Sequence, residues 1–204
     1  MARALFGIDK IDSGSIYVEG DKVKLKSSKS AIKIGLGLLT EDRKSQGLVM
    51  NMSVKDNITL PSLNQFSKWG IIDSNKEMNA ANKYKNELGI KVTSGDQMVM
   101  NLSGGNQQKV VLSKWLCSNA TIFILDEPTR GIDVGSRQEI YRLMNDITAN
   151  ESSILIISSD LTELLSVCDR IMVMHEGKVN GEFLRPNFDS KNILHCALGG
   201  VSEA

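Results

Sequence analysis

The chain has 204 residues, enough for one domain with a substantial core and a smaller attached lobe. Its 24 lysines and arginines balance 24 aspartates and glutamates, which argues against a basic surface for nucleic acid or anionic lipid. No apolar run approaches the ~20 residues that a membrane-spanning helix requires, and the first residues do not resemble a signal peptide. The 3 cysteines are widely spaced without a C-x-x-C pattern, which argues against disulfides and a zinc site and indicates a reducing compartment.

The first part of the chain predicts a helix end, a small β lobe and one buried strand. Residues 1–6 have the pattern of the last turns of a helix. Residues 15–18 and 22–25 are two short strand-like runs around a Gly-Asp turn, which is a hairpin signal. Residues 34–39 form an apolar strand that runs into the polar loop 40–47 (TEDRKSQG). A polar loop at the end of a strand is often functional.

The composition becomes polar and helical between residues 53 and 100, which predicts a separate helical lobe. Ser74 with Glu77 three residues later has the pattern of a capping box, and Gly89 has the pattern of a helix stop. We expect Trp69 to pack within this lobe rather than to stack on a base.

Helices and strands alternate after residue 106. The predicted order is helix 107–117, strand 121–125, a helix capped by Asp133, strand 153–158, a helix capped by Asp160, and strand 170–174. Such alternation predicts a parallel sheet covered by helices. The sequence after residue 185 is uninformative about further elements.

Two motifs in this region suggest nucleotide chemistry. Residues 102–108 (LSGGNQQ) place a serine and two glycines at the start of a helix, where free backbone amides and the positive end of the helix dipole favour phosphate. Residues 122–127 (IFILDE) are a buried strand that ends in two acids. Ligands of parallel α/β sheets bind at such strand ends, so one acid can hold hydrated Mg²⁺ and the other can act on water.

Together the two motifs resemble those of ABC ATPases, in which residues 102–108 would be the signature and residues 122–127 a Walker B strand. Residues 40–44 (TEDRK) and 126–135 (DEPTRGIDVG) resemble the second ATP-binding half of the sugar-type ABC import ATPases, the ribose, galactose and xylose group. The resemblance covers nearly the whole chain. It implies an α/β fold of the RecA-like P-loop NTPase type, with a mostly parallel sheet, a small antiparallel β lobe and a helical lobe.

The resemblance also implies roles for the first motif. In ABC ATPases two nucleotide-binding domains meet head to tail, and each ATP lies between the phosphate loop of one domain and the signature of the other. Ser103, Gly104 and Gly105 would then contact the terminal phosphate of an ATP bound by a partner domain. Asn106 and Gln107 would lie in the first helical turn behind them. Independently of the resemblance, glycines let a backbone approach phosphate closely.

For the second motif, the resemblance implies that Asp126 holds Mg²⁺ through water and that Glu127 is the general base that acts on the attacking water. Asp133 matches a loop that crosses the dimer interface, and it also fits a plain helix cap. Glu41 stands where most ABC domains have a glutamine that binds magnesium and senses the membrane partner. Ser159 stands where they usually have a histidine that touches the terminal phosphate, and serine cannot supply a cationic imidazole.

The sequence lacks the phosphate-binding pattern G-x-x-x-x-G-K-[ST], because its one Gly-Lys pair, at residues 177–178, has no upstream glycine and is followed by valine. In the resembled family that loop lies just before a helix end like residues 3–7. We therefore expect an N-terminally truncated chain with little ATP hydrolysis of its own. The expected segments are 1–48 (part of the β lobe and core), 49–101 (helical lobe), 102–185 (signature and Walker B core) and 186–204 (tail).

The implied parent protein is the ATPase subunit of a monosaccharide importer that uses ATP and Mg²⁺ at the cytoplasmic face of the cell membrane. Its partners would be a second nucleotide-binding domain, permease subunits and, indirectly, a periplasmic or extracellular sugar-binding protein; no nucleic acid is expected. One alternative is a non-catalytic module that completes another domain's site, against which Glu127 argues. Another is a chromosome-maintenance or repair ABC ATPase, which would need long heptad coiled coils that this sequence lacks.

Two interpretations remain open for Arg43 and Lys44: a solvated loop, or part of the surface that contacts the membrane subunit. His175 and His195 have no acids or cysteines at ligand spacing, so we interpret both as surface residues rather than metal ligands.

Overall fold

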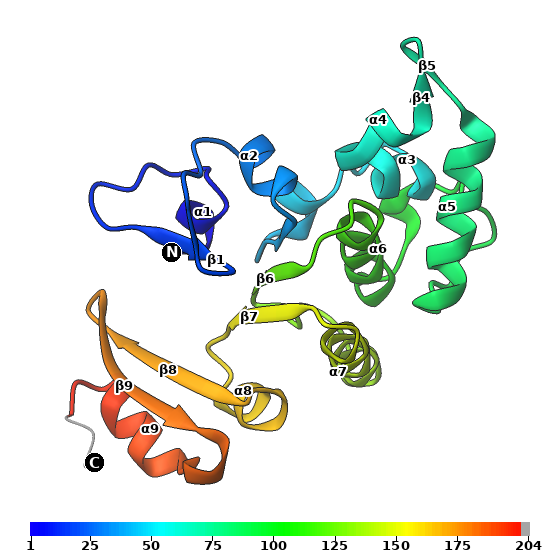
Figure 1. Ribbon diagram of the computed structural model, residues 1–204. Coiled ribbons are helices and arrows are strands. Elements are labelled where there is room, and N and C mark those ends of the chain that lie inside the picture. The colour runs from blue at the N-terminus through cyan, green and yellow to red at the C-terminus, as the bar shows by residue number, and fades with distance from the viewer. Residues whose placement is uncertain (201–204) are drawn as a thin grey trace. The chain divides into compact units, whose positions relative to one another are not determined.

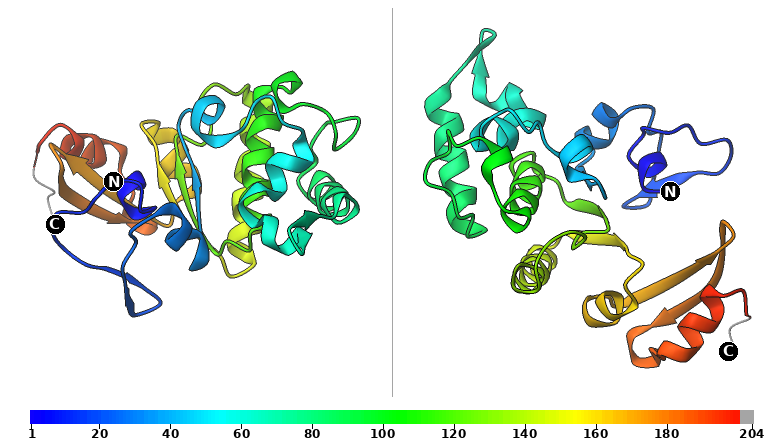
Figure 2. Two further views of the ribbon diagram at one scale, coloured as in Figure 1. Left: turned by 90° about the horizontal axis from the view of Figure 1, so that it is seen from above. Right: turned by 180° about the vertical axis from the view of Figure 1, so that it is seen from behind.

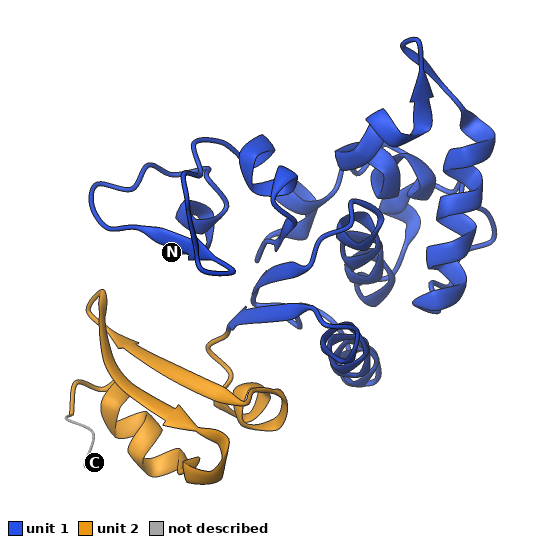
Figure 3. Cartoon of the chain, in the orientation of Figure 1, with its two compact units in different colours: residues 1–157 blue, residues 158–204 orange. Residues whose placement is uncertain are grey.

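The computed structural model describes residues 1–200, which divide into two compact units (Figure 3). Unit 1 comprises residues 1–157, and unit 2 begins at Ser158. In chain order unit 1 contains α1 (Ala2–Leu5), β1 (Ile16–Val18), β2 (Asp21–Val23), α2 (Ser28–Lys33), β3 (Leu36–Leu39), the π-helical turn η1 (Arg43–Gly47), α3 (Val54–Thr59), η2 (Leu60–Ser62), α4 (Leu63–Phe66), β4 (Ser67–Lys68), β5 (Ile71–Ile72), α5 (Ser74–Glu87), η3 (Val99–Asn101), α6 (Gly104–Cys117), β6 (Ile122–Asp126), α7 (Val134–Ala149) and β7 (Ser153–Ile157) (Figure 1).

A three-stranded parallel sheet in the order β3-β6-β7 forms the centre of unit 1. The short apolar runs of β3 and β6 are buried, as expected of strands with both faces covered. Helix α6 contacts β3, and α7 contacts β7. Leu39 pairs with Leu125, so β3 and β6 end side by side. This register brings the loops that follow the two strands to one edge of the sheet.

The helices α3, α5 and α6 pack together beside this sheet (Figures 1 and 2). Buried polar contacts support the packing, since the Thr59 hydroxyl donates to the buried Glu77 carboxylate over 2.7 Å. The indole N–H of Trp115, on α6, donates to the Leu38 carbonyl of β3 over 2.7 Å, and its ring meets Phe6 edge to face. Helix α6 is therefore fixed both to the helical part and to the sheet.

Unit 2 is a small α/β assembly with its own apolar cluster. It contains α8 (Leu161–Val167), β8 (Arg170–His175), β9 (Lys178–Leu184), η4 (Arg185–Asn187) and α9 (Ser190–Ala197). Strands β8 and β9 pair as an antiparallel hairpin, and α9 packs on both strands. Ile171, Phe183 and Ile193 are among the buried side chains that hold the three elements together.

The structure matches the predicted mixed α/β class but corrects three local expectations. Strand β8 pairs with β9 instead of extending the parallel sheet. The tail, about which the sequence is uninformative, carries α9. Helix α5 is capped by Asp73, which accepts from the amides of Asn75 and Lys76, rather than by Ser74. Trp69 lies at the turn of the projecting β4–β5 hairpin, where it is 93% exposed and does not pack within the lobe (Figure 1).

The predicted boundaries at residues 48, 101 and 185 differ from the division between the two units, and they stay a prediction. The four residues 201–204 of the predicted tail segment lie outside the described part. In residues 1–200, no helix combines the length and the apolar character needed to cross a membrane.

Candidate functional site

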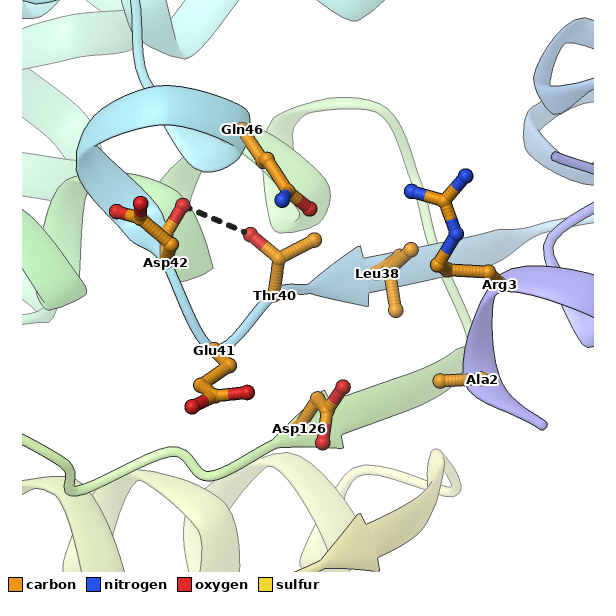
Figure 4. Close-up of a pocket in the computed structure, with 8 residues that line it drawn as sticks. All are labelled: Ala2, Arg3, Leu38, Thr40, Glu41, Asp42, Gln46 and Asp126. Atoms are coloured by element: carbon orange, nitrogen blue, oxygen red, sulfur yellow. Dashed lines mark hydrogen bonds between the residues drawn. The ribbon is translucent and has the colours of Figure 1, made fainter.

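A pocket of about 160 Å³ opens at the carboxyl ends of β3 and β6 (Figure 4). Its acidic lining comes from Asp126, the last residue of β6, and from Glu41 and Asp42 in the loop after β3. Thr40 also lines the pocket, and its hydroxyl donates to the Asp42 carbonyl over 3.4 Å. The adjacent strand ends thus bring together Glu41 and Asp126, two acids predicted as metal ligands.

The two acids at the end of β6 differ in their surroundings. Burial raises the pKa of Asp126, and the neighbouring charge of Glu127 raises it further. Glu127 adopts a left-handed backbone with φ of 48°, which is uncommon for a residue that carries a side chain. Its N–H donates to the Ile157 carbonyl of β7 over 2.8 Å, which holds this turn against the sheet. Such conformations concentrate at functional sites.

The donor set of the pocket fits a hard divalent cation that is shared with a ligand. Asp126 and Glu41 supply carboxylate oxygens, which Mg²⁺ prefers. Glu41 is ion-paired with Arg130, so its carboxylate is already engaged. Across residues 1–200, no group of three or more His, Cys, Asp or Glu side chains could enclose a metal. A cation at Asp126 would therefore complete its shell with phosphate or water oxygens, as Mg²⁺ usually does.

Helix α6 begins without a side-chain cap. Ser103 occupies the N-cap position, but it makes no capping hydrogen bond, and its hydroxyl accepts from the Asn106 side chain over 2.9 Å. The other described α-helices of six or more residues, which are α2, α3, α5, α7, α8 and α9, all have a side-chain cap. The first amides of a helix need partners, and an anion is one such partner.

The glycines at this helix start lie against the loop that leads into α7. A Cβ on Gly104 would come within 2.9 Å of the Gly131 carbonyl oxygen. A Cβ on Gly105 would come within 2.6 Å of the Ser136 Cβ. Real Cβ atoms do not approach neighbours so closely, so glycine is needed here for packing inside the chain. The signature-like segment and the loop after Glu127 are consequently neighbours.

Asp133 caps α7, as predicted. Its carboxylate accepts from the Ser136 amide over 2.9 Å and from the Ser136 hydroxyl over 2.7 Å. These hydrogen bonds lower the pKa of Asp133. A role for Asp133 across a dimer interface stays a prediction.

Arg43 connects the pocket loop to both motifs, which the sequence did not indicate. Its guanidinium donates to Gln107 Oε1 over 3.3 Å, to the Arg130 carbonyl over 3.0 Å and to the Gly131 carbonyl over 3.3 Å. Arg43 is half-buried and hydrogen-bonded, whereas Lys44 is exposed, so the two residues differ; a contact of either with a membrane subunit stays a prediction. No local pattern could have identified it, because its partners lie 64 to 88 residues away.

Comparison with known proteins identifies this arrangement. The family model described as "ABC transporter" matches residues 1–130. The chain belongs to the ABC transporter family. A ribose import ATP-binding protein of Lactococcus lactis subsp. cremoris is 48% identical over 198 residues, which are 97% of this chain and 40% of that protein. A xylose import ATP-binding protein of Thermoanaerobacter pseudethanolicus is 49% identical over 201 residues, 98% of this chain and 40% of that protein. The chain thus spans about 40% of the length of these curated relatives.

Solved structures confirm the fold. A nucleotide-free ATP-binding cassette from an ABC transporter superposes with a TM-score of 0.80 at 21% identity, covering 97% of this chain and 82% of that one. A dimeric ATP-binding cassette in a post-hydrolysis state, bound to ADP and Pi, gives a TM-score of 0.74 at 20% identity, covering 92% of this chain and 80% of that one. The predicted ABC-type α/β fold is therefore correct.

Besides Glu127 in the turn after β6 and Asp133 at the cap of α7, the predicted site residues fall into three groups. Asp126 and Glu41 line one pocket, while the segment 103–107 lies at the start of α6. The Gln107 side chain is buried and donates to the Val99 carbonyl over 3.2 Å, so it serves packing here. Ser159 belongs to unit 2 and is exposed. The nucleotide roles of all these residues stay predictions.

Proposed function

We propose that this chain is part of the ATP-binding subunit of an ABC importer for a monosaccharide such as ribose, galactose or xylose. Within it, we assign the chain to the second nucleotide-binding half. The start of α6 would bind the terminal phosphate of an ATP held by a partner nucleotide-binding domain. The whole subunit would act at the cytoplasmic face of the membrane, on permease subunits that receive sugar from a binding protein.

The observation that supports this proposal most is the uncapped start of α6. Ser103 leaves the first amides of the helix without a side-chain cap, although it is a residue type that usually provides one. In a chain of the ABC transporter family, a phosphate oxygen is the partner that these amides and the helix dipole favour.

The acids at the end of β6 take separate roles in this proposal. Asp126 would hold Mg²⁺ through water, and Glu41 would join the same shell after release from Arg130. Bound Mg²⁺ would neutralise charge on the phosphates. Glu127 would act as general base on the attacking water, a role that contributes roughly 10²–10⁴-fold in rate. Because the sequence has no G-x-x-x-x-G-K-[ST] pattern, we expect little or no ATP hydrolysis by the purified chain.

Association with an intact ABC nucleotide-binding domain tests the proposal. Sedimentation velocity of the mixture should show a heterodimer that forms with a non-hydrolysed ATP analogue and Mg²⁺ and is lost with ADP. Ser103→Glu places a carboxylate beside the phosphate and should weaken the association about tenfold or more. Asn82→Glu makes the same charge change at an exposed position of α5 and should leave it unaltered. A heterodimer that forms equally well with and without the ATP analogue, and equally well with Ser103→Glu, would contradict the proposal.

A non-catalytic partner module is the second candidate, which the missing phosphate-loop pattern favours. The two candidate functions predict different effects of Glu127→Gln on ATP hydrolysis. If the chain contributes chemistry, Glu127→Gln should slow ATP hydrolysis by the mixed dimer at the site next to Asp126, which is separate from the site that pairs the partner's phosphate loop with Ser103. If it is an inert partner, hydrolysis by the mixture should be unchanged. Steady hydrolysis by the pure chain that Glu127→Gln abolishes would overturn the expected inactivity.

A further inference from the structure

Three segments that are distant in sequence meet at one side chain. Arg43 follows the pocket residues Glu41 and Asp42, and its guanidinium donates to the Gln107 side chain of α6 and to the carbonyls of Arg130 and Gly131. A guanidinium carries five N–H donors in a rigid planar fork, so one arginine can hold several acceptors at fixed positions.

The start of α6 is shaped to admit this guanidinium. A Cβ on Gly104 would lie only 2.7 Å from Arg43 Nη2 and 2.9 Å from the Gly131 carbonyl oxygen. Gly104 therefore leaves room for the contact between Arg43 and the loop after β6. This packing reason for glycine is separate from any approach of phosphate to the backbone.

A second link joins the same two loops. The Glu41 carboxylate, at the pocket, is ion-paired with the Arg130 guanidinium. Arg130 thus receives a hydrogen bond from Arg43 at its carbonyl and an ion pair from Glu41 at its side chain. A displacement of the pocket loop would pull on the loop after Glu127 at two points.

We propose that Arg43 is a positioning residue that couples the pocket loop, residues 40–47, to the start of α6 and to residues 130–131. Through Arg43, the arrangement of acids in the pocket determines whether the start of α6 is held ready for an anion. The anion-binding part of this inference rests on the proposed function, whereas the coupling of the three segments does not.

Hydrogen exchange of the purified chain, followed by mass spectrometry, tests the coupling without nucleotide. Arg43→Met should make peptides that cover residues 103–107 and 128–133 exchange about tenfold faster, because hydrogen bonds to a charged group are lost in both. Lys44→Met removes the adjacent exposed cation and should change neither region. Faster exchange confined to residues 40–47, or spread evenly over the chain, would overturn the proposal.

Two further variants make the test independent of one substitution. Arg43→Lys keeps the charge but not the planar fork, so the exchange rates of both regions should fall between those of wild type and Arg43→Met. If Arg43→Met does not fold, faster exchange of the same peptides in Arg43→Lys tests the coupling instead. Gly104→Ala should accelerate both regions by displacing the guanidinium, and its effect should shrink in an Arg43→Met background. Equal effects of Gly104→Ala in both backgrounds would contradict the coupling.

Association separates this inference from the function on which part of it rests. Arg43→Met should weaken the nucleotide-dependent heterodimer with an intact ABC nucleotide-binding domain about tenfold, and Lys44→Met should not. If the wild-type chain forms no such heterodimer, the proposed function fails while the exchange result stands. If it forms one that Arg43→Met leaves unchanged, the positioning role in anion binding is wrong.

Discussion

Helices α6 and α7 both flank the parallel sheet and both begin beside the loop after β6, yet they are held in opposite ways. Helix α7 has a carboxylate cap at Asp133 and buries only an apolar stripe. Helix α6 has no side-chain cap and buries most of its length, including Gln107, Lys109 and Lys114. The long polar side chains of α6 donate hydrogen bonds to backbone carbonyls of other segments.

The difference shows how a helix can do without its own cap. Lys109 donates to the Gly89 carbonyl over 2.9 Å and forms an ion pair with Glu139 over 2.8 Å. Gln108 donates to the Pro128 carbonyl over 2.6 Å. Tertiary bonds of this kind hold α6 along its length, so its first turn can remain available to a ligand. Helix α7 combines its Asp133 cap and apolar stripe with the Glu139 ion pair to α6.

The largest expected effect concerns the buried lysine of α6. Lys114 donates to the Gly47 carbonyl, and burial lowers its pKa to about 8. Between pH 8 and pH 10.5 the unfolded chain keeps this proton and the folded chain loses it, so the free energy of unfolding should rise with pH by about 3 kcal/mol from this group. Urea unfolding from pH 7 to pH 11 should show this rise in wild type relative to Lys114→Met.

The quantity to compare is the difference in the free energy of unfolding between wild type and Lys114→Met at each pH. This difference is needed because Tyr84 and Cys168 also titrate in this range. Burial raises the pKa of Tyr84 to about 12 and that of Cys168 to about 11, and both groups lower stability as pH rises. Their contributions are common to both proteins and cancel. Lys29→Met, at an exposed position of α2, controls for the loss of one charge. Parallel pH profiles of wild type and Lys114→Met would refute the prediction.

The second effect is steric and acts where the two helix starts meet. Gly105→Ala places a methyl group against Ser136, so overpacking should cost about 1–3 kcal/mol in the free energy of unfolding, measured by urea titration. Ser136→Gly removes the atoms that clash and should recover part of the loss. Gly135→Ala, whose Cβ would come no closer than 3.3 Å to Asp133, is the matched control and should be neutral or slightly stabilising. Equal behaviour of Gly105→Ala and Gly135→Ala would show that the two helix starts are not in tight contact.

The sequence revealed the parts of this arrangement that have a local pattern. The strand β6 appears as an uninterrupted apolar run because both its faces are buried, and Asp133 appears as a cap because it precedes a helical apolar stripe. The family resemblance implied that Glu41 and Asp126 serve one metal, and parallel strands that end at one edge explain why both line one pocket.

Other features had no local signal. Lysine usually marks a solvated face, so the burial of Lys109 and Lys114 could not be foreseen. Their acceptors are carbonyls 20 and 67 residues away, and only the tertiary fold selects them. Trp69 shows the reverse error: a large apolar side chain was expected inside, but a tight hairpin turn leaves it exposed.

A smaller effect should come from the cap of α7. Asp133→Ala removes the bonds to Ser136 and should lower the melting temperature by about 2–4 °C, whereas Asp133→Asn, which keeps a capping oxygen, should lower it less. The pKa of Asp133 is lowered by its hydrogen bonds, so the stabilisation is present above about pH 4 and is lost as pH falls through the folded pKa. Thermal melts at pH 7 and pH 2.5 check both points, and an equal difference at the two pH values would contradict this account.

The smallest effect on stability should come from Ser103→Ala, although serine at an N-cap position normally contributes about 1 kcal/mol. Ser103 makes no capping bond, so the melting temperature should change by less than about 1 °C. Its hydroxyl accepts only from the Asn106 side chain, which is partly exposed and can bond to water instead. Under the proposed function, the same substitution should weaken nucleotide-dependent association with an intact ABC nucleotide-binding domain, because it would remove a polar contact to phosphate. A loss of stability as large as that of Asp133→Ala would mean that Ser103 caps α6 in solution, and the contrast between the two helices would then disappear.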